Sequence, residues 1–289
     1  NKISISDNGR GIPIDKHPKY PDKSALEVIL STLHAGGKFS NKAYQTSGGL
    51  HGVGISVVNA LSKEVIVEVV RDKKLYRQSF SRGVVTSKLE FIEEVKTKSG
   101  TKVTFVPDEQ IFTEQAHFEP EKLYKFIKAK AYLHKGVKIH WLSYQEFQNV
   151  PVKEEICFPN GIEDLLTDIC GSEKLVIEKK FSGNENLAAG GRVEWCIAWP
   201  EYTDGHLQSF CNTVKTPLGG THVSGMKSAL LKGVQNFANL QNKKNLNVNG
   251  DDILNGSIII LSVFISEPQF QGQTKEKLVS REVSKRIED

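Results

Sequence analysis

Two glycine-rich clusters in the sequence have the residue types that bind phosphate groups. The first is Asp7-Asn-Gly-Arg-Gly-Ile-Pro13, and the second is Ser47-Gly-Gly-Leu-His-Gly-Val-Gly54. Glycine has no Cβ, so the backbone can approach a ligand closely, and successive free N–H groups at a helix N-terminus bind anions. The second cluster places four glycines just before a predicted helix. This arrangement suits a polyphosphate.

Two charged residues beside these clusters could complete a nucleotide site. Asp7 follows a predicted strand and could accept a hydrogen bond from an amine such as the exocyclic amine of adenine, although a turn-forming aspartate fits equally well. Lys38 follows Gly36 and Gly37 and could reach a phosphate as a point charge, although a solvated loop lysine is the alternative. Taken alone, the first cluster also fits a simple bend between a strand and a turn.

The spacing of the glycines excludes the two common nucleotide motifs. The second cluster reads G-x-x-G-x-G, whereas dinucleotide folds carry G-x-G-x-x-G with an acidic residue at the end of a following strand. The sequence also contains no G-x-x-x-x-G-K-[ST] loop. The clusters therefore predict a nucleotide site of neither type.

Strands and helices alternate along the first half and must position these clusters. Hydrophobic periodicity predicts strands at Lys2–Ser6, Glu64–Val70, Thr101–Val106 and Val137–Leu142, and helices at Ser24–His34, from Ile55 through Leu61 and at Pro120–His134. In the second half it predicts helices at Gly161–Ile169 and about His222–Leu240, and strands near Val176–Phe181, Arg192–Trp199, Gln208–Asn212 and Ser257–Ile265. The pattern weakens around Tyr144–Phe158, so we predict two domains, residues 1–154 and 155–289.

Length and composition agree with a globular protein of two domains. The 289 residues exceed one typical hydrophobic core, and the sequence has no apolar run of membrane-spanning length. The four cysteines, widely spaced, favour buried thiols in a reducing cytoplasm over a zinc site or a disulfide framework. The net charge of +4 permits contact with a polyanion without arguing for it. Because strand-like alternation starts at the first residue, the chain looks cut from something longer.

The order of these motifs resembles the ATPase superfamily of gyrase, heat-shock chaperones, histidine kinases and mismatch-repair proteins. The motifs are Asp7-x-Gly9-x-Gly11, Gly36-Gly37-Lys38-Phe39, Gly48-Gly49-Leu50-His51-Gly52-Val53-Gly54 and Gly100-Thr101. The string from Leu33 to Ser62 is more specific and resembles the B subunits of bacterial type IIA DNA topoisomerases. Gly219-Gly220-Thr221-His222 and Pro268 to Lys275 extend the resemblance over essentially the whole chain.

The resemblance implies an α+β fold and a role for each motif residue. The fold would be a GHKL-type ATPase sandwich followed by a ribosomal-protein-like transducer domain with a left-handed β-α-β crossover. ATP would be bound by Asp7 and Thr101 at the adenine, by Gly11 and Ile12 lining the site, by Arg10 and Pro13 at the mouth where aminocoumarin inhibitors bind, by Lys38 in the lid, and by Leu50, His51, Gly52, Val53 and Gly54 at the phosphates. From the second domain, Gln273 and Lys275 would reach the γ-phosphate, although in local composition Lys275 is one more lysine of a charged tail.

The resemblance also implies a cofactor and partners. Mg2+ would accompany ATP, but the family's metal ligand and its general-base glutamate lie upstream of Asp7 and outside this sequence, so we expect the chain as given to hydrolyse almost no ATP. The parent protein would act on duplex DNA in a heterotetramer of two A and two B subunits, with ATP-dependent dimerisation of the B subunits and no membrane contact.

Three other assignments stay open at this point. The segment from Phe39 to Ser47 looks closer to topoisomerase IV, which relaxes and decatenates DNA, than to gyrase, which introduces negative supercoils. A chaperone-type ATPase would share Asp7 and the glycine motifs without the string from Leu33 to Ser62. A nucleotide-sensing binding module would keep the pocket but would need no second domain that contacts the γ-phosphate.

Overall fold

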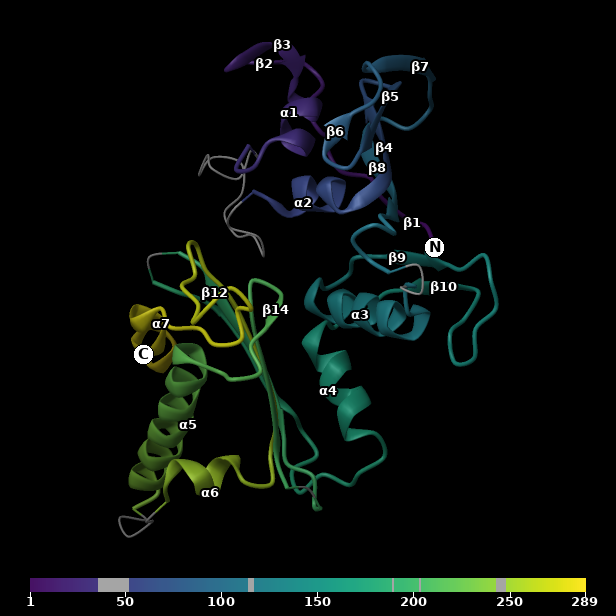
Figure 1. The fold of residues 1–289 in the computed structure, drawn as a ribbon. Coiled ribbons are helices and arrows are strands. Elements are labelled where there is room, and N and C mark those ends of the chain that lie inside the picture. The colour runs from purple at the N-terminus through teal and green to yellow at the C-terminus, as the bar shows by residue number, and fades with distance from the viewer. Residues whose placement is uncertain (36–51, 114–116, 189, 203, 243–247) are drawn as a thin grey trace. The chain divides into compact units, whose positions relative to one another are not determined.

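The chain folds into two compact units. The computed structural model describes residues 1–35, 52–113, 117–188, 190–202, 204–242 and 248–289. One unit comprises the described residues up to Phe118, and the other comprises those from Glu119 onward. Each unit has a β-sheet of its own, covered by helices (Figure 1).

The first unit is built on an antiparallel sheet. Its elements are β1 (Ile3–Asp7), β2 (Lys16–His17), β3 (Tyr20–Ser24), α1 (Ala25–Ser31), α2 (Gly54–Ala60), β4 (Ser62–Arg71), β5 (Lys74–Ser81), β6 (Val84–Val85), β7 (Glu90–Glu94) and β8 (Gly100–Pro107). The strand order is β1-β8-β4-β5-β6, β7 pairs with β5, and β2 and β3 form a separate hairpin. The long strands β4 and β8 therefore lie at the centre of the sheet and carry β1 on its edge.

Buried and exposed residues alternate along β4, and the buried ones form part of the hydrophobic core of the first unit. Val65, Val67 and Val69 are fully buried against α1 and α2, because residues two apart share one face of a strand. Ser24 caps α1 by accepting the Glu27 N–H at 3.1 Å, as the sequence predicts. The two helices are also joined directly by polar contact, since the buried Asn59 side chain of α2 donates to the carbonyl at the end of α1 at 3.1 Å.

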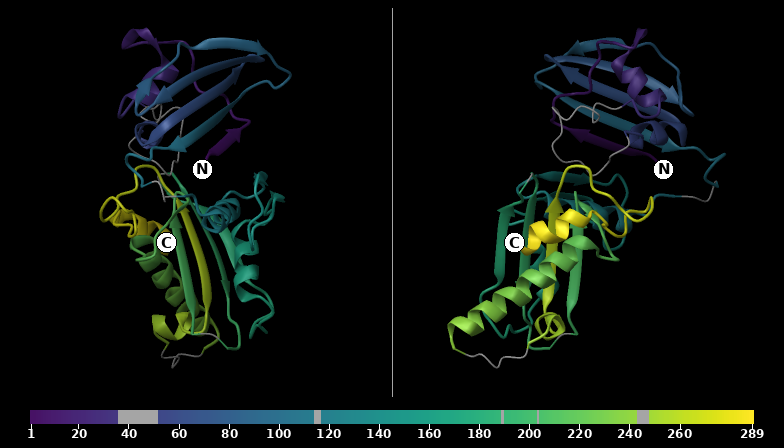
Figure 2. Two further views of the ribbon diagram at one scale, coloured as in Figure 1. Left: turned by 45° about the vertical axis from the view of Figure 1, so that its right-hand side comes forward. Right: turned by 90° about the vertical axis from the view of Figure 1, so that its left-hand side faces the viewer.

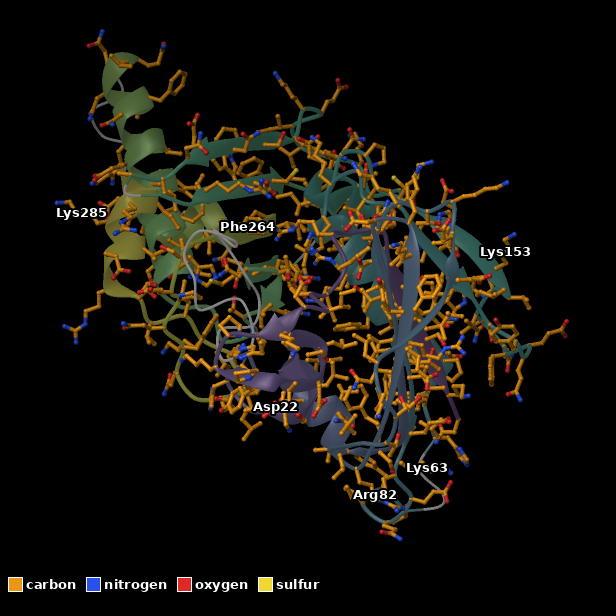
Figure 3. The ribbon with its side chains drawn as sticks, turned by 90° about the horizontal axis from the view of Figure 1, so that it is seen from above. Asp22, Lys63, Arg82, Lys153, Phe264 and Lys285 are labelled. Carbon is orange, nitrogen blue, oxygen red and sulfur yellow. The ribbon has the colours of Figure 1, made fainter. Side chains whose placement is uncertain are left out.

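Ion pairs hold the end of this sheet where β4 begins and β5 ends. The Arg82 guanidinium donates to both carboxylate oxygens of Asp108, at 2.5 and 3.1 Å, and lowers the pKa of that carboxyl. Lys63 pairs with Glu109 beside it. Figure 3 labels Arg82 and Lys63 at this end of the sheet.

The second unit has a five-stranded mixed sheet. Its elements are α3 (Pro120–Leu133), β9 (Ile139–Leu142), β10 (Lys153–Ile156), α4 (Ile162–Cys170), β11 (Phe181–Asn186), β12 (Arg192–Ala198), β13 (His206–Cys211), β14 (Val214–Lys215), α5 (Thr221–Leu240), α6 (Gly250–Leu254), β15 (Ile258–Phe264) and α7 (Arg281–Glu288). The strand order is β11-β12-β15-β13-β14. The neighbours β13 and β15 run parallel and are connected through α5, which confirms a β-α-β crossover.

This sheet has a hydrophobic core on each face. Residues of β15 alternate, so that Ile258 and Ile260 pack with α4 while Leu261 and Val263 pack with α5 and α7. Figure 2 shows α4 on one side of the sheet and the long α5 with α7 on the other. All seven residues of β15 are buried, as expected of a central strand covered on both faces.

Most predicted elements are confirmed, and one predicted strand is wrong. Residues 176–179 form bends, and the strand β11 starts only at Phe181. Val176 and Ile177 are 67% and 53% exposed, so these apolar side chains do not belong to the buried face of a sheet. The elements that hydrophobic periodicity does not predict are β2, β3, β5, β6, β7, β10, β14, α6 and α7.

The division between the compact units falls earlier than the predicted domain boundary. Residues 154 and 155 lie inside β10, which pairs with β9 in the second unit. The helix α3 packs in that unit as well, where the Tyr132 hydroxyl donates to Asp168 of α4. The domain limits 1–154 and 155–289 stay a prediction about the family's domains.

Most of the cysteine side chains lie inside the fold. All four cysteines are free thiols; Cys170, Cys196 and Cys211 are buried and Cys157 is half-buried. Within the described ranges, no helix is both long and apolar enough to cross a membrane.

Candidate functional site

A carboxylate and a hydroxyl meet at one end of the first unit's sheet. Asp7 ends β1 and lies directly opposite Thr101 of β8 in the antiparallel register. The buried Thr101 side chain accepts the backbone N–H of Ile12 at 3.2 Å. Because a hydroxyl can accept and donate at once, Thr101 keeps a donor for a neighbour or a ligand. The structure thus brings together three of the predicted site residues.

The Asp7 side chain is oriented by the loop that follows it. Its Oδ1 accepts the backbone N–H of Gly9 at 2.8 Å, which is the local turn that aspartate favours. A Cβ on Gly9 would lie only 2.8 Å from the same oxygen. A carboxylate has further lone pairs, so the exposed Asp7 can accept another hydrogen bond while this turn is held.

Gly11 packs against the end of β4 in a conformation that favours glycine. Its φ is +75°, and a Cβ there would lie 2.6 Å from the Val70 carbonyl oxygen. Arg71 donates from Nη1 to the Gly11 carbonyl at 3.2 Å. Arg71 is not among the residues predicted from the sequence, although a charged residue at the end of an apolar alternating strand could have indicated it. Together these contacts fix the backbone of the Asp7–Pro13 loop.

The remaining loop residues divide between core and surface. Ile12 is half-buried and packs against the core under α1, whereas Arg10 and Pro13 are exposed. The roles that the resemblance implies for these three residues stay predictions.

The second glycine cluster is described only from Gly52. Gly52 has φ +60°, Val53 precedes the first residue of α2, and a Cβ on Gly54 would meet none of the described residues within 4 Å. No side chain of the described residues caps α2, and the first N–H groups of a helix attract anions. Lys38, Leu50 and His51 lie outside the described residues.

In the second unit, Gln273 and Lys275 lie at the tip of a hairpin between β15 and α7. Backbone hydrogen bonds join Gln271 N–H to Lys277 O at 2.9 Å and Val279 N–H to Gln269 O at 2.8 Å. Gln273 is exposed, and Lys275 is half-buried with φ +60°. The tip of the hairpin is therefore a turn whose place is fixed by the paired backbone segments at the hairpin base.

Burial makes the Cys211 thiol, which lies near this hairpin, a poor nucleophile. Burial raises the pKa of Cys211 to about 12, although the positive charge of Lys275 acts in the opposite direction. A thiol with such a pKa is protonated at neutral pH and is a weak nucleophile. In the part of the chain that the structure describes, no group of three His, Cys, Asp or Glu side chains could hold a metal ion.

Family models match both halves of the chain. Residues 1–111 match the model described as histidine kinase-, DNA gyrase B- and HSP90-like ATPase, and residues 161–289 match the model described as DNA gyrase B. The first match contains Asp7, Thr101 and the start of α2, and the second contains the Lys275 hairpin.

Relatives of similar sequence are topoisomerase subunits. The DNA topoisomerase 4 B subunit of Rickettsia prowazekii is 52% identical over 293 residues, and that of Caulobacter vibrioides is 45% identical over 294. The DNA gyrase B subunit of Campylobacter jejuni is 42% identical over 280 residues. These alignments cover 100%, 99% and 96% of this chain and 44%, 42% and 35% of the relatives. The chain thus spans less than half the length of these relatives.

Solved structures of ATPase domains share the fold. The 43K ATPase domain of Thermus thermophilus gyrase B, in complex with an aminocoumarin, has a TM-score of 0.81 at 31% identity, covering 99% of this chain and 72% of that one. The topoisomerase IV ATP-binding domain of Francisella tularensis, in complex with a small-molecule inhibitor, has a TM-score of 0.78 at 30% identity, covering 100% and 76%. With a GHKL-type ATPase domain, a following gyrase-B-type domain and these relatives, the chain belongs to the family of bacterial type IIA DNA topoisomerase B subunits.

Proposed function

We propose that this chain is the ATP-binding portion of the B subunit of a topoisomerase IV, and that the parent protein couples ATP to the passage of one DNA duplex through another. Relaxation and decatenation of DNA would be the outcome. Higher identity to the two topoisomerase 4 relatives than to the gyrase relative supports this choice. The second candidate is the B subunit of a gyrase, with negative supercoiling as its activity.

The pairing of Asp7 with Thr101 carries the ATP-binding part of the proposal. The Asp7 carboxylate is held by Gly9 and has lone pairs for the exocyclic amine of adenine. The Thr101 hydroxyl is held by Ile12 and can donate toward the same ligand edge. Gly11 and Ile12 line the base site, and Arg10 and Pro13 form its mouth.

The second glycine cluster serves the phosphates. Gly52, Val53 and Gly54 open α2, whose first turn is capped by no side chain of the described residues and offers N–H groups to an anion. We assign Leu50 and His51 to the same task and Lys38 to a lid over the nucleotide. Mg2+ would accompany the phosphates and offset their charge; none of the residues assigned above is proposed as its ligand.

Gln273 and Lys275 act as sensors of the γ-phosphate in this proposal. A lysine that contacts only the terminal phosphate loses its partner when that phosphate is cleaved and released. Charge-assisted hydrogen bonds of this type are worth roughly 1.5–3 kcal/mol each. A difference of that size can bias the orientation of two domains between two states.

The partners follow from the family. Duplex DNA is the substrate, and a topoisomerase A subunit completes an assembly of two A and two B subunits that closes when the B subunits dimerise on ATP. Contacts with DNA would go to its phosphates without reading bases, so affinity should fall as the salt concentration rises.

The test combines the full-length protein with its A subunit and supplies catenated and relaxed circular DNA. Separation of catenated circles that requires ATP supports topoisomerase IV. Negative supercoiling of the relaxed circles would instead establish the gyrase alternative. If neither substrate changes with ATP, while ATP is still bound, the strand-passage proposal fails.

A further inference from the structure

The base of the Lys275 hairpin is clamped by the segment that starts α5. The Leu278 N–H donates to the Gly219 carbonyl at 3.0 Å, and the Leu278 carbonyl accepts the Thr221 N–H at 3.0 Å. The Leu218 N–H donates to the Glu276 carbonyl at 3.0 Å. The strand 276–278 is therefore paired on one side with 218–221 and on the other with 269–271.

Only glycine fits the centre of this clamp. Gly220 has φ +133°, and a Cβ there would lie 2.1 Å from the Leu278 carbonyl oxygen and 2.7 Å from the Leu278 nitrogen. Real Cβ atoms do not approach backbone so closely, and the backbone on both sides is hydrogen-bonded. Any side chain at this position must push the hairpin away from α5.

Both partners of the clamp are anchored in the core. Leu278 is fully buried in the cluster beneath α5 and α7. On the other side, the fully buried His222 lies 3.0 Å from the Thr216 hydroxyl, which lies 2.7 Å from Ser209 of β13. The α7 backbone also touches α5 directly, since a Cβ on Gly225 would lie 2.4 Å from the Ser284 carbonyl oxygen. Figure 2 shows α7 lying against α5.

We infer that Gly220 is a positioning residue for Lys275. By letting the start of α5 clamp Leu278, it fixes the hairpin base and with it the place of the lysine relative to α5. The inference rests on the proposed contact of Lys275 with the γ-phosphate. It adds that the motif Gly219-Gly220-Thr221-His222 acts through this hairpin and touches no nucleotide itself.

The test measures nucleotide preference in the full-length protein. The readout is the ratio of the affinity for an imido analogue of ATP to the affinity for ADP, measured by calorimetry. Because Lys275 would contact only the γ-phosphate, displacing it lowers this ratio and leaves ADP binding unchanged. We expect Gly220→Ala and Lys275→Met each to lower the ratio roughly tenfold or more. The double variant should lower the ratio no further than Lys275→Met alone.

A matched control comes from the same helix. Gly233 lies in α5, and a Cβ there would meet nothing within 4 Å, so Gly233→Ala should leave the ratio unchanged. If Gly220→Ala fails to fold, Thr221→Pro replaces it. Thr221 is the first residue of α5, where proline is tolerated, and the change removes the N–H that the Leu278 carbonyl accepts in the clamp.

Two outcomes overturn the inference, and they differ. If Lys275→Met lowers the ratio while a folded Gly220→Ala or Thr221→Pro variant keeps it, the clamp at Gly220 does not position the lysine, and the nucleotide contact stands. If Lys275→Met itself leaves the ratio unchanged, the proposed γ-phosphate contact fails and the inference falls with it.

Discussion

Asp7 and Thr101, far apart in the sequence, stand directly opposite one another where β1 pairs with β8. Each is held by a backbone N–H of the same short loop, Asp7 by Gly9 and Thr101 by Ile12. The loop thus orients both side chains before any ligand arrives. Such preorganisation reduces the entropy that binding would otherwise cost.

Replacing Asp7 should weaken nucleotide binding without unfolding the protein. In Asp7→Asn the side-chain oxygen can still accept the Gly9 N–H, so the turn survives. The charge that would strengthen the proposed bond to the adenine amine is lost, and we expect affinity for ATP and ADP to fall roughly tenfold to a hundredfold. Calorimetric titration with each nucleotide measures this.

The control for this prediction is a carboxylate of the same unit. Asp22 is exposed on β3, and Asp22→Asn should bind both nucleotides as the unaltered protein does. Wild-type affinity in a folded Asp7→Asn protein would remove Asp7 from the adenine site.

Gly11→Ala should lower both stability and nucleotide affinity. The new Cβ would stand 2.6 Å from the Val70 carbonyl at a φ of +75°, so the loop must move away from β4. We expect a loss of about 1–3 kcal/mol in the free energy of unfolding, measured by urea denaturation without nucleotide. Gly54→Ala, whose Cβ would meet none of the described residues within 4 Å, should unfold at close to the wild-type midpoint. Equal midpoints for the two variants would contradict the packing argument.

Hydrophobic periodicity predicts those elements whose burial is simple. It predicts β4 because Val65, Val67 and Val69 alternate, and all three are buried. It misses β5 because that strand buries a polar residue, Gln78, beside Phe80. It misses α7 because charged residues outnumber the two buried side chains of this helix, and the packing of α7 against the predicted helix α5 becomes visible only in the fold.

The residues of the candidate site are likewise predicted only in part. The resemblance predicts Asp7, Thr101 and Lys275, because their motifs are contiguous in the sequence. The resemblance does not predict Arg71 and Leu278, since each donates a hydrogen bond to the backbone carbonyl of a glycine far away in the sequence. Contacts of this kind depend on strand pairing and on glycine conformation. The side-chain types of the two residues in contact therefore do little to predict them.

Thiol labelling should single out Cys157. Burial raises the pKa of Cys170, and it raises the pKa of Cys196 and Cys211 to about 12, so these buried thiols stay protonated and shielded. Cys157 is half-buried and reachable. Brief treatment of the folded protein with a maleimide at a pH of about 7.5 should add one label, detected by mass spectrometry, because a thiol that the reagent can reach reacts before thiols that are buried and protonated. Cys157→Ser should abolish it, and rapid labelling of that variant would contradict the burial of the others.

His222 should make the second unit less stable in mild acid. Burial lowers its pKa from an ordinary value of 6.5 to about 4, because the fully buried ring is kept from water, which would stabilise its charged form. Between these two values the unfolded chain binds a proton that the folded chain does not. Stability from this group is therefore complete above about pH 6.5 and is lost as the pH falls toward 4, by about 3 kcal/mol in all.

Urea denaturation from about pH 7.5 down to about pH 4.5, followed by the fluorescence of Trp195 and the other tryptophans, measures this loss. His222→Gln cannot take up a proton, so its stability should start lower at neutral pH but decline less over the range. His140, exposed on β9, provides the matched control, and His140→Gln should decline as steeply as the unaltered protein. An equally steep decline in His222→Gln would place the acid sensitivity elsewhere and remove the neutral buried ring from the anchoring of α5.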